Sequence, residues 1–296
     1  MKAGTRSFFK AVIILMILSA VTLFLIADIY VSYNCLRTVS YVIETEQIQD
    51  SVTICLLADL HDHRFGDRNS ELVEAVRETD PDLILAAGDF INEGSQTAAV
   101  ATELIPQLLE IAPVYYSLGN QEKGYIRAGR SDLMRELQGA GAIVLEDTYT
   151  VLEINGNKIC LAGMYEYAFE LDGSGQMDKS GIAPDRLRFL EEFQEQDCFK
   201  LMMSHRPDSF IFGHAAETWD IDLVVSGHLH GGQVVLPFLG GLYAGDQGFF
   251  PRYIYGEYQF PTVKNMIITG GLGSDKEKLP RLNNPPEIVS ITLEHQ

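Results

Sequence analysis

The sequence predicts an α/β protein preceded by a single apolar helix, and three observations support this prediction. Strand-like apolar runs alternate with helix-like segments over most of the chain, which is typical of α/β sheets. Residues 11–27 form a nearly unbroken apolar run close to the N-terminus. Several strand-like runs stop at Asp, Asn or His residues, and α/β sheets bind their ligands beyond the carboxyl ends of strands.

The 296 residues suffice for one large domain or two small ones. We find no repeat, low-complexity tract or internal linker, so residues 51–296 are expected to form one domain. The net charge of −19 argues against a nucleic-acid partner, whose phosphates require a basic surface. A phosphorylated small molecule remains compatible with this charge, because bound divalent cations can supply positive charge locally.

The four cysteines show no C-x-x-C spacing. Cys55 and Cys160 lie inside apolar strand-like runs. Buried thiols are therefore expected there, in preference to disulfides or zinc sites.

The apolar run at 11–27 meets the lower bound of ~17 residues for a membrane-spanning helix. Lys10 can extend to one interface, and Tyr30 and Tyr33 suit the other. A cleaved signal peptide is the alternative, but its apolar region is usually ~7–15 residues long and precedes an Ala-x-Ala site, which we do not find. We therefore expect an uncleaved anchor with its flanks at 1–34 and a tether at 35–50.

Positive charge is concentrated before the apolar run, at Lys2, Arg6 and Lys10. The flank that follows carries Arg37 among several acidic residues. The positive-inside bias then predicts a single-pass protein of the cell membrane, with a cytoplasmic N-terminus and an extracytoplasmic main domain.

The first half of the domain is predicted to alternate strand and helix. Buried strands are expected at 52–58, 82–87 and 113–118, with helices at 69–79 and from Ser95 or Thr97 to 111. In the second half, Asn155-Gly156-Asn157 predicts a hairpin turn between strands at 148–154 and 158–162. A helix at 184–195 and strands at 199–204, 221–225, 265–269 and 288–293 complete the set.

Residues 234–258 are rich in glycine, proline and aromatic side chains and are expected to form a shaped loop over a pocket. Its aromatic residues are expected to pack against the sheet edge, and gripping an apolar substrate at the membrane is the alternative. These residues are Tyr243, Phe249, Phe250 and Tyr253.

His228 and His230 follow a buried strand and are surrounded by glycine. On an extended segment their side chains would project to the same face, because strand side chains have a period of two. Two imidazoles directed together indicate metal ligation.

Five strand-like runs stop at side chains that can bind a metal. They are Asp59, His61, Asp89, Asn120, His205, His228 and His230. Mixed carboxylate, amide and imidazole ligands suit manganese, iron or zinc. Seven candidates, of which one can bridge, favour two divalent ions over one.

The order of these segments resembles the calcineurin-like metallophosphoesterase family. The matching pieces are Asp59-Leu60-His61, Gly88-Asp89, Gly119-Asn120, His205 and Gly227-His228-Leu229-His230. The stretches 204–208 and 240–251 further resemble a bacterial membrane-associated branch. The resemblance implies a four-layer α/β/β/α sandwich that holds a dinuclear metal centre.

The resemblance also implies roles for the ligands. Asp59, His61 and His230 would bind one ion. Asn120, His205 and His228 would bind the other, and Asp89 would bridge them. Such a centre hydrolyses a phosphodiester or pyrophosphate with a hydroxide that the two ions share. We expect Asn120, Gln121 and His228 to be the catalytic residues.

Gln121 departs from the family pattern, which usually has His after the Asn of the third motif. A carboxamide can donate a hydrogen bond but cannot act as a general acid. Three interpretations remain open: a substrate with a good leaving group, a substitute proton donor such as Glu122 or His63, or a domain with little turnover.

Arg206 and His63 are the predicted substrate contacts, with a surface ion pair and a rim position as their alternatives. The predicted partner is a phosphorylated small molecule or lipid, and the lipid part rests only on the anchor. A low-turnover or non-catalytic module that binds phosphorylated ligands with metal is the alternative function.

Overall fold

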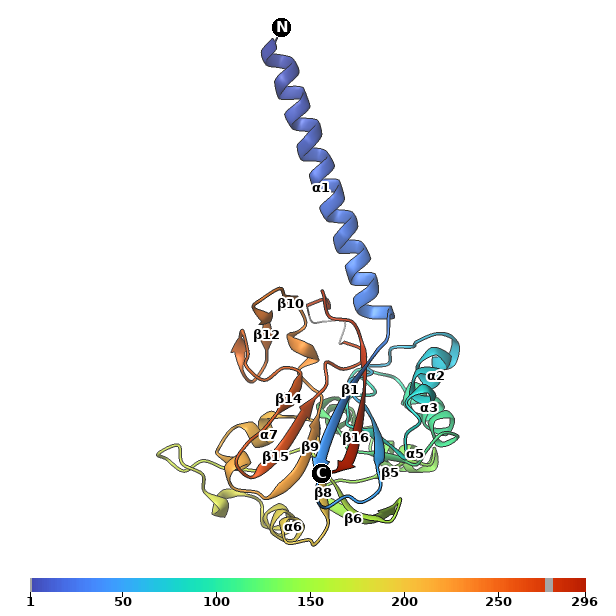
Figure 1. Ribbon diagram of the computed structural model, residues 1–296, viewed down its shortest axis with the longest axis vertical. Coiled ribbons are helices and arrows are strands. Elements are labelled where there is room, and N and C mark those ends of the chain that lie inside the picture. Colours follow the sequence, from blue (N-terminus) through green and yellow to red (C-terminus); the bar gives the residue numbers. More distant parts are fainter. Residues whose placement is uncertain (1, 275–278) are drawn as a thin grey trace.

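The computed structural model describes residues 2–274 and 279–296, and Figure 1 shows one long helix standing on a globular part. The side chains of residues 1–7, which include Lys2 and Arg6, lie outside the described part. Two six-stranded sheets form the centre of the globular part.

The first sheet has the strand order β1-β16-β2-β3-β4-β5. All neighbours in it are parallel except β16 and β2. Its strands are β1 (Arg37–Thr45), β16 (Glu287–His295), β2 (Val52–Leu57), β3 (Leu83–Ala86), β4 (Val114–Tyr116) and β5 (Ile143–Val144).

The second sheet has the order β14-β15-β9-β8-β7-β6. Its four central strands are parallel, and both edge strands are antiparallel. The strands are β14 (Gly256–Tyr258), β15 (Val263–Ile268), β9 (Ile221–Ser226), β8 (Phe199–Ser204), β7 (Asn157–Met164) and β6 (Thr148–Ile154). Strands β6 and β7 form the predicted hairpin.

The two sheets pack face to face. Leu56 and Leu85 of the first sheet share one apolar cluster with Leu201 and Val225 of the second. Helices α2 (Ser70–Glu78), α3 (Ala99–Leu109) and α5 (Leu133–Gly139) cover the outer face of the first sheet. Helices α6 (Pro184–Gln194) and α7 (Asp208–Ile211) cover the second. The four-layer α/β/β/α prediction is confirmed.

Short elements connect these layers. They are η1 (Asp67–Asn69), α4 (Asn120–Arg127), η2 (Lys179–Gly181), η3 (Ala215–Glu217), η4 (His230–Gly232), β10 (Val235–Leu236), β11 (Gly240–Gly241), β12 (Tyr243–Ala244) and β13 (Gly248–Phe249). The last four build the 234–250 loop as two small hairpins.

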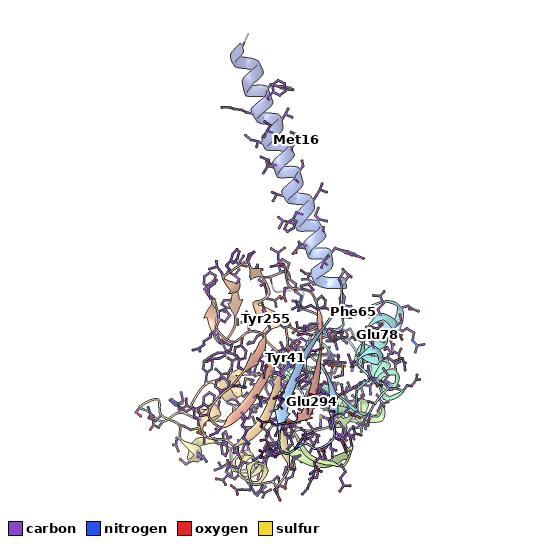
Figure 2. The ribbon with its side chains drawn as sticks, in the orientation of Figure 1. Met16, Tyr41, Phe65, Glu78, Tyr255 and Glu294 are labelled. Atoms are coloured by element: carbon purple, nitrogen blue, oxygen red, sulfur yellow. A yellow bond between two sulfur atoms is a disulfide. The ribbon has the colours of Figure 1, made fainter. Side chains whose placement is uncertain are left out.

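The N-terminal helix α1 (Lys2–Asn34) projects away from the globular part, and the side chains of its apolar run, such as Met16, point outward on all sides (Figure 2). Within the described residues, α1 is the one helix long and apolar enough to cross a membrane by length and composition.

The structure differs from the predicted tether at 35–50. Only Cys35 and Leu36 separate α1 from β1, and β1 pairs with β16 along its whole length. Side chains on one face of β1 turn inward, with Ile43 buried between the sheets. Residues 37–45 are therefore part of the core sheet.

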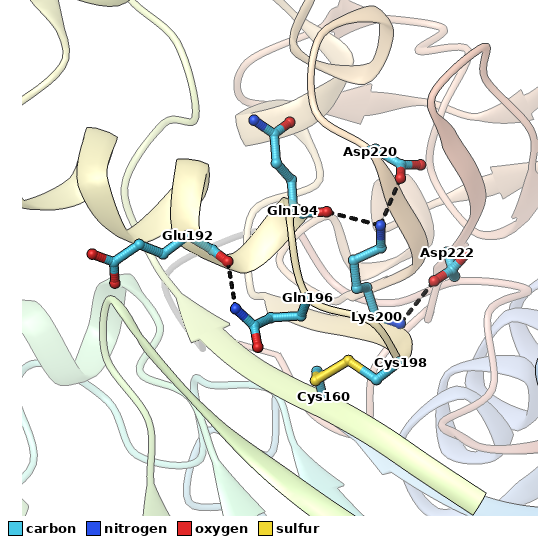
Figure 3. The surroundings of a disulfide bond; sticks show 8 residues. All are labelled: Cys160, Glu192, Gln194, Gln196, Cys198, Lys200, Asp220 and Asp222. Atoms are coloured by element: carbon cyan, nitrogen blue, oxygen red, sulfur yellow. Dashed lines mark hydrogen bonds and ion pairs between the residues drawn. A yellow bond between two sulfur atoms is a disulfide. The ribbon is translucent and has the colours of Figure 1, made fainter.

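The prediction of a buried free thiol at Cys160 is wrong, because Cys160 forms a disulfide with Cys198 (Figure 3). Parallel pairing of β7 with β8 aligns Cys160 with Lys200, which brings Cys198 within reach. Spacing along the sequence carries no trace of this pairing. Cys55 is buried and free as expected, and burial raises the pKa of its thiol to about 12.

Candidate metal centre

The predicted ligands come from both sheets and meet where the carboxyl ends of the central strands converge. Strands β2, β3 and β4 lead to Asp59 and His61, to Asp89, and to Asn120. Strands β8 and β9 lead to His205, and to His228 and His230. Six of these residues form two groups, in each of which the potential metal-binding atoms lie within 4.8 Å of one another. The first group is Asp59, His61 and His230, and the second is Asp89, His205 and His228.

The first group surrounds the carboxylate of Asp59. Asp59 Oδ1 lies 4.0 Å from Nε2 of His61 and 3.8 Å from Nε2 of His230. All three side chains are buried. Such a carboxylate with two imidazoles suits one divalent cation.

The second group adjoins the first through Asp89. Asp89 Oδ2 lies 3.2 Å from Nε2 of His205 and 3.8 Å from Nε2 of His61. One carboxylate oxygen therefore faces an imidazole of each group.

Hydrogen bonds orient three of the imidazoles. Nδ1 of His61 donates to Asn92 Oδ1 at 2.8 Å, and Nδ1 of His205 donates to the Ala87 carbonyl at 2.7 Å. Nδ1 of His230 lies 3.3 Å from the Gly273 carbonyl. These contacts fix the tautomer that directs the Nε2 lone pair toward the carboxylates, as in metal-binding histidines.

His228 is held through Nε2 and not through Nδ1. Its Nε2 lies 3.5 Å from Asp246 Oδ2, which leaves Nδ1 as its ligand atom. Asp246 also accepts a hydrogen bond from Arg206 at 2.6 Å. These two contacts hold the pKa of Asp246 at about 2, so it stays a carboxylate.

The prediction that His228 and His230 project to one face of an extended segment is wrong. Both have positive φ, 73° and 47°, in the turn after β9. Their rings diverge: His230 lies against His61, and His228 lies against His205. The turn thus sends one imidazole to each group.

The residues fit divalent cations, because several buried polar atoms in the site have no hydrogen-bond partner of normal geometry among the described residues. A buried polar atom without a partner is costly, and a cation between them removes that cost. These atoms are His61 Nε2, Asp89 Oδ2, Asn120 Oδ1 and His205 Nε2.

The carboxylates and imidazoles of the site shift one another's pKa values. Burial raises the pKa of the Asp59 carboxyl. Burial also acts to raise the pKa of Asp89, but the neighbouring His205 lowers it by more, so that the pKa of Asp89 is lowered overall. Asp89 in turn raises the pKa of His205 to about 9 against the effect of burial. Metal binding requires a neutral imidazole and therefore releases that proton.

The backbone around the ligands is tightly packed. Asp59, His61 and Asp89 all have positive φ, between 50° and 57°. A Cβ at Gly119 would overlap the Asp89 carboxylate, and one at Gly271 would lie 2.7 Å from Asp59 Oδ2. Strain of this kind is typical of functional sites.

Comparison with known proteins now decides the family. Residues 52–232, well over half of the chain, match the family described as calcineurin-like phosphoesterase. The chain belongs to this family. All seven ligand candidates lie within the matched residues.

Curated relatives agree with the assignment to the calcineurin-like phosphoesterases. The chain is 30% identical over 244 residues to phosphodiesterase YaeI of Escherichia coli, a match that covers 81% of each chain. It is 27% identical over 276 residues to the uncharacterized metallophosphoesterase YkuE of Bacillus subtilis, which covers 89% of this chain and 87% of YkuE.

Two solved structures also resemble this phosphoesterase. TT1561 of Thermus thermophilus is 15% identical, with a TM-score of 0.44, and the match covers 75% of this chain and 91% of TT1561. A dimetal phosphatase from Danio rerio is 13% identical, with a TM-score of 0.40 and coverage of 75% and 88%.

The protein is a metal-dependent phosphoesterase, and hence a hydrolase. Its family uses divalent metals, and the clustered carboxylates and imidazoles suit them. Its substrate is phosphorylated.

Glu122 supports the site of this phosphoesterase but is not a substitute proton donor. It is fully buried and accepts hydrogen bonds from the backbone of Asp89, Phe90 and Gly119, and from Tyr116 Oη. Both carboxylate oxygens are thus occupied. The alternative in which Glu122 protonates a leaving group finds no support in this geometry.

Gln121 lies beside the second group. Its backbone N–H donates to Asp89 Oδ1 at 2.8 Å, and its Oε1 accepts from the backbone of Glu93 at 2.7 Å. The carbonyl end is therefore held in place, and the NH₂ group is the donor end of the carboxamide.

The two predicted substrate contacts, Arg206 and His63, have different surroundings. Arg206 donates to Asp246 and to Tyr167 Oη in the wall next to His228. His63 packs against Phe65 at 4.5 Å between ring centres. Arg206 is therefore adjacent to the ligand groups, whereas the ring of His63 packs against the core residue Phe65.

Arg281 and Asn284 were not found from the sequence. The buried guanidinium of Arg281 donates to the carbonyls of Gly270, Gly271 and Gly273, and so holds the turn that touches Asp59 and His230. Burial lowers its pKa to about 10, and it remains a cation. Neither residue belongs to a motif, so only the fold reveals them.

A cavity of about 340 Å³ opens beside His228 and His230. Its remaining lining residues are mainly apolar or small: Leu229, Gln233, Tyr243, Ala244, Gly245 and Leu279. An apolar cavity next to polar ligand groups is typical of a binding site for a substrate with an apolar part.

Proposed function

We propose that this phosphoesterase is a dinuclear enzyme that hydrolyses a phosphodiester or pyrophosphate bond while anchored in a membrane. One observation carries the proposal: Asp89 Oδ2 lies within 4 Å of an imidazole from each ligand group. A carboxylate in that position is suited to hold two cations at once.

The assignment of ligands follows the two groups. Asp59, His61 and His230 hold one ion. His205 and His228 hold the other together with Asn120, whose Oδ1 is buried and has no hydrogen-bond partner among the described residues. Asp89 contacts both, and the mixture of ligands suits manganese, iron or zinc.

When bound, two divalent cations neutralise the charge of a phosphoryl group and make hydroxide available near neutral pH. The NH₂ group of Gln121 then donates to a phosphate oxygen. His228 is kept in position by Asp246, and Arg206 closes the wall beside it. None of these residues protonates the leaving group, which favours substrates whose leaving group departs as an anion, such as a pyrophosphate.

Helix α1 is the proposed anchor. The cationic residues that precede its apolar run favour a cytoplasmic N-terminus and an extracytoplasmic domain. The Cys160–Cys198 disulfide supports that orientation, because disulfides persist in oxidising compartments.

The test uses the full-length protein in detergent, stripped of metal and reloaded with manganese. We expect two metal ions per chain and hydrolysis of bis(4-nitrophenyl) phosphate. Asp89→Asn should lower kcat/KM at least a hundredfold and reduce the bound metal. Asp185→Asn, at an exposed position in α6, is the matched control and should change neither. One ion or none per chain contradicts the dinuclear proposal.

The alternative is a module that binds phosphorylated ligands without turnover. The lack of a general acid at Gln121 and the fully engaged Glu122 favour it. Two bound ions together with no hydrolysis of any phosphodiester or pyrophosphate would support this alternative.

A further inference from the structure

No spacer separates the apolar run of α1 from the globular part. The run ends at Ala27, and the next residue already contacts the domain: Asp28 Oδ2 accepts a hydrogen bond from the backbone of Asn283 at 2.6 Å. One turn later, Ser32 Oγ accepts from the backbone of Asn284 at 3.1 Å. A bilayer around α1 must therefore touch this end of the domain.

The same two asparagines connect α1 to the metal centre. Asn283 Nδ2 donates to the Val235 carbonyl at 3.0 Å, and Asn284 Nδ2 donates to the His230 carbonyl at 2.7 Å. Asn284 is buried. The orientation of the ligand groups relative to the helix axis is thus fixed by a short chain of hydrogen bonds.

Large apolar side chains stand exposed at this end of the domain. Figure 1 shows β10 and β12, which belong to the hairpins carrying most of them, at the end from which α1 leaves. We call these residues the apolar rim: Phe238, Leu239, Phe249, Phe250 and Leu279. Phe238 is fully exposed, and Phe249 is 72% exposed.

The rim overturns part of a sequence prediction. Phe249 and Phe250 were expected to pack against the sheet edge, yet both face solvent. Tyr253 behaves as expected and packs against the outer core of the second sheet. Clustered exposed aromatic and aliphatic residues are unusual on a soluble surface and mark an interaction site.

The apolar cavity lies between the rim and the metal centre. Leu279 belongs to both the rim and the cavity lining, and Tyr243 of the lining contacts Phe249 of the rim. The same cavity is lined by His228 and His230. The cavity therefore adjoins both the rim and the ligand groups.

We propose that the apolar rim inserts into the bilayer that holds α1, and that the cavity receives the apolar chain of an amphiphilic phosphoester. We assign the bilayer as the partner that covers the rim, because α1 joins the domain without a spacer at the end where the rim lies. The insertion stands on that geometry alone. The substrate class rests on the proposed function of the metal centre.

Insertion of the rim into the bilayer is tested by fluorescence, which does not depend on enzymatic activity. The chain has one tryptophan, the buried Trp219, whose emission gives the baseline. Full-length Phe238→Trp is placed in phosphatidylcholine and phosphatidylglycerol vesicles that contain brominated lipid. We expect at least twofold quenching of the added emission. Phe212→Trp, at an exposed position directly after α7, should not be quenched, because α7 lies away from α1 (Figure 1). Equal quenching of the two variants, or none, overturns the insertion.

The substrate class is tested with two aryl phosphodiesters that share one leaving group, ethyl 4-nitrophenyl phosphate and hexadecyl 4-nitrophenyl phosphate in the same vesicles. In both, a water oxygen bonds to phosphorus, the bond to the aryl oxygen breaks, nitrophenolate departs, and the proton of the water goes to solvent. The triple variant Phe238→Glu, Leu239→Glu, Phe249→Glu should lose at least fivefold on the hexadecyl ester and keep its rate on the ethyl ester. Leu171→Glu, an exposed position between β7 and η2, is the matched control and should keep both rates.

The outcomes separate the two proposals. If the triple variant keeps its rate on the hexadecyl ester while both esters are hydrolysed, the amphiphilic substrate is overturned and the phosphoesterase stands. If neither ester is hydrolysed by the unmodified protein, the proposed function and the substrate class fail together. The fluorescence result still decides the insertion in that case.

Discussion

Glu122 fixes Asp89 through the backbone: Oε2 of Glu122 accepts from the Asp89 N–H at 2.8 Å, while Oε1 accepts from Tyr116 Oη at 2.7 Å. A glutamine in its place presents an NH₂ group to donors and loses at least one of these bonds. Because hydrogen bonds to a buried charged group contribute about 1.5–3 kcal/mol each, Glu122→Gln should lower the free energy of unfolding by on the order of 2–4 kcal/mol.

Thermal unfolding of the detergent-solubilised protein measures this loss, and metal content shows whether Asp89 has moved. Glu78→Gln, at an exposed position at the end of α2, is the matched control and should leave both unchanged. An unfolding temperature equal to that of the unmodified protein would show that the Glu122 contacts contribute no net stability.

Gln121→His should restore a proton donor beside the second ligand group. A general acid contributes ~10²–10⁴-fold for a poor leaving group and little for a good one. We therefore expect a gain of roughly tenfold or more on an alkyl phosphodiester and a small change on an aryl one. Gln121→Asn, which also lacks a proton donor, is the control, and equal changes on both substrates would contradict this role.

The Cys160–Cys198 disulfide should contribute strongly to stability. It closes a loop of 38 residues, for which chain entropy gives about 4 kcal/mol. The double variant Cys160→Ala, Cys198→Ala should therefore melt on the order of 10 °C lower. Cys35→Ala, at the exposed free cysteine, should have the same unfolding temperature as the unmodified protein. Identical melting of the double variant would show that the bridge does not restrain the unfolded chain.

Asp208 should make stability depend on pH. Burial, followed by the nearby Asp246, raises the pKa of the Asp208 carboxyl to about 6. The folded protein holds this proton more tightly than the unfolded chain, so stability is present at low pH and is lost as the pH rises through about 6. Asp208→Asn should remove the loss and raise the unfolding free energy at pH 8 by roughly 2–3 kcal/mol.

Unfolding of metal-free Asp208→Asn at pH 4 and pH 8 checks the sign. The gain should be large at pH 8 and absent at pH 4, where the carboxyl is neutral in the folded protein. Asp185→Asn, at an exposed position, should show no such difference. A gain in unfolding free energy of equal size at both pH values would show that the substitution acts through packing and not through the charge of Asp208.

Much of the site could be predicted because its ligands stand where strands end. Asp59, Asp89 and His205 each follow a short, largely buried and mainly apolar strand, and a parallel sheet brings such ends together. The divergence of His228 and His230 could not be predicted, since it depends on positive φ at both residues.

Other features depend on partners distant in sequence. Only Ile43 of strand β1 is buried, and its partner β16 begins 250 positions after it. Glu122 reads as an ordinary helical residue until α4 is placed beside the backbone of Asp89. Spacing along the chain carries no information on such contacts.

The direct joint between α1 and β1, only Cys35 and Leu36 long, has a consequence for how the enzyme meets its substrate. Under the proposed anchoring, a domain held so closely cannot swing out toward the bulk solution or reach a neighbouring membrane. For the proposed amphiphilic substrate, encounters would then take place by lateral diffusion within a single leaflet, and turnover would follow the surface density of substrate around the anchor.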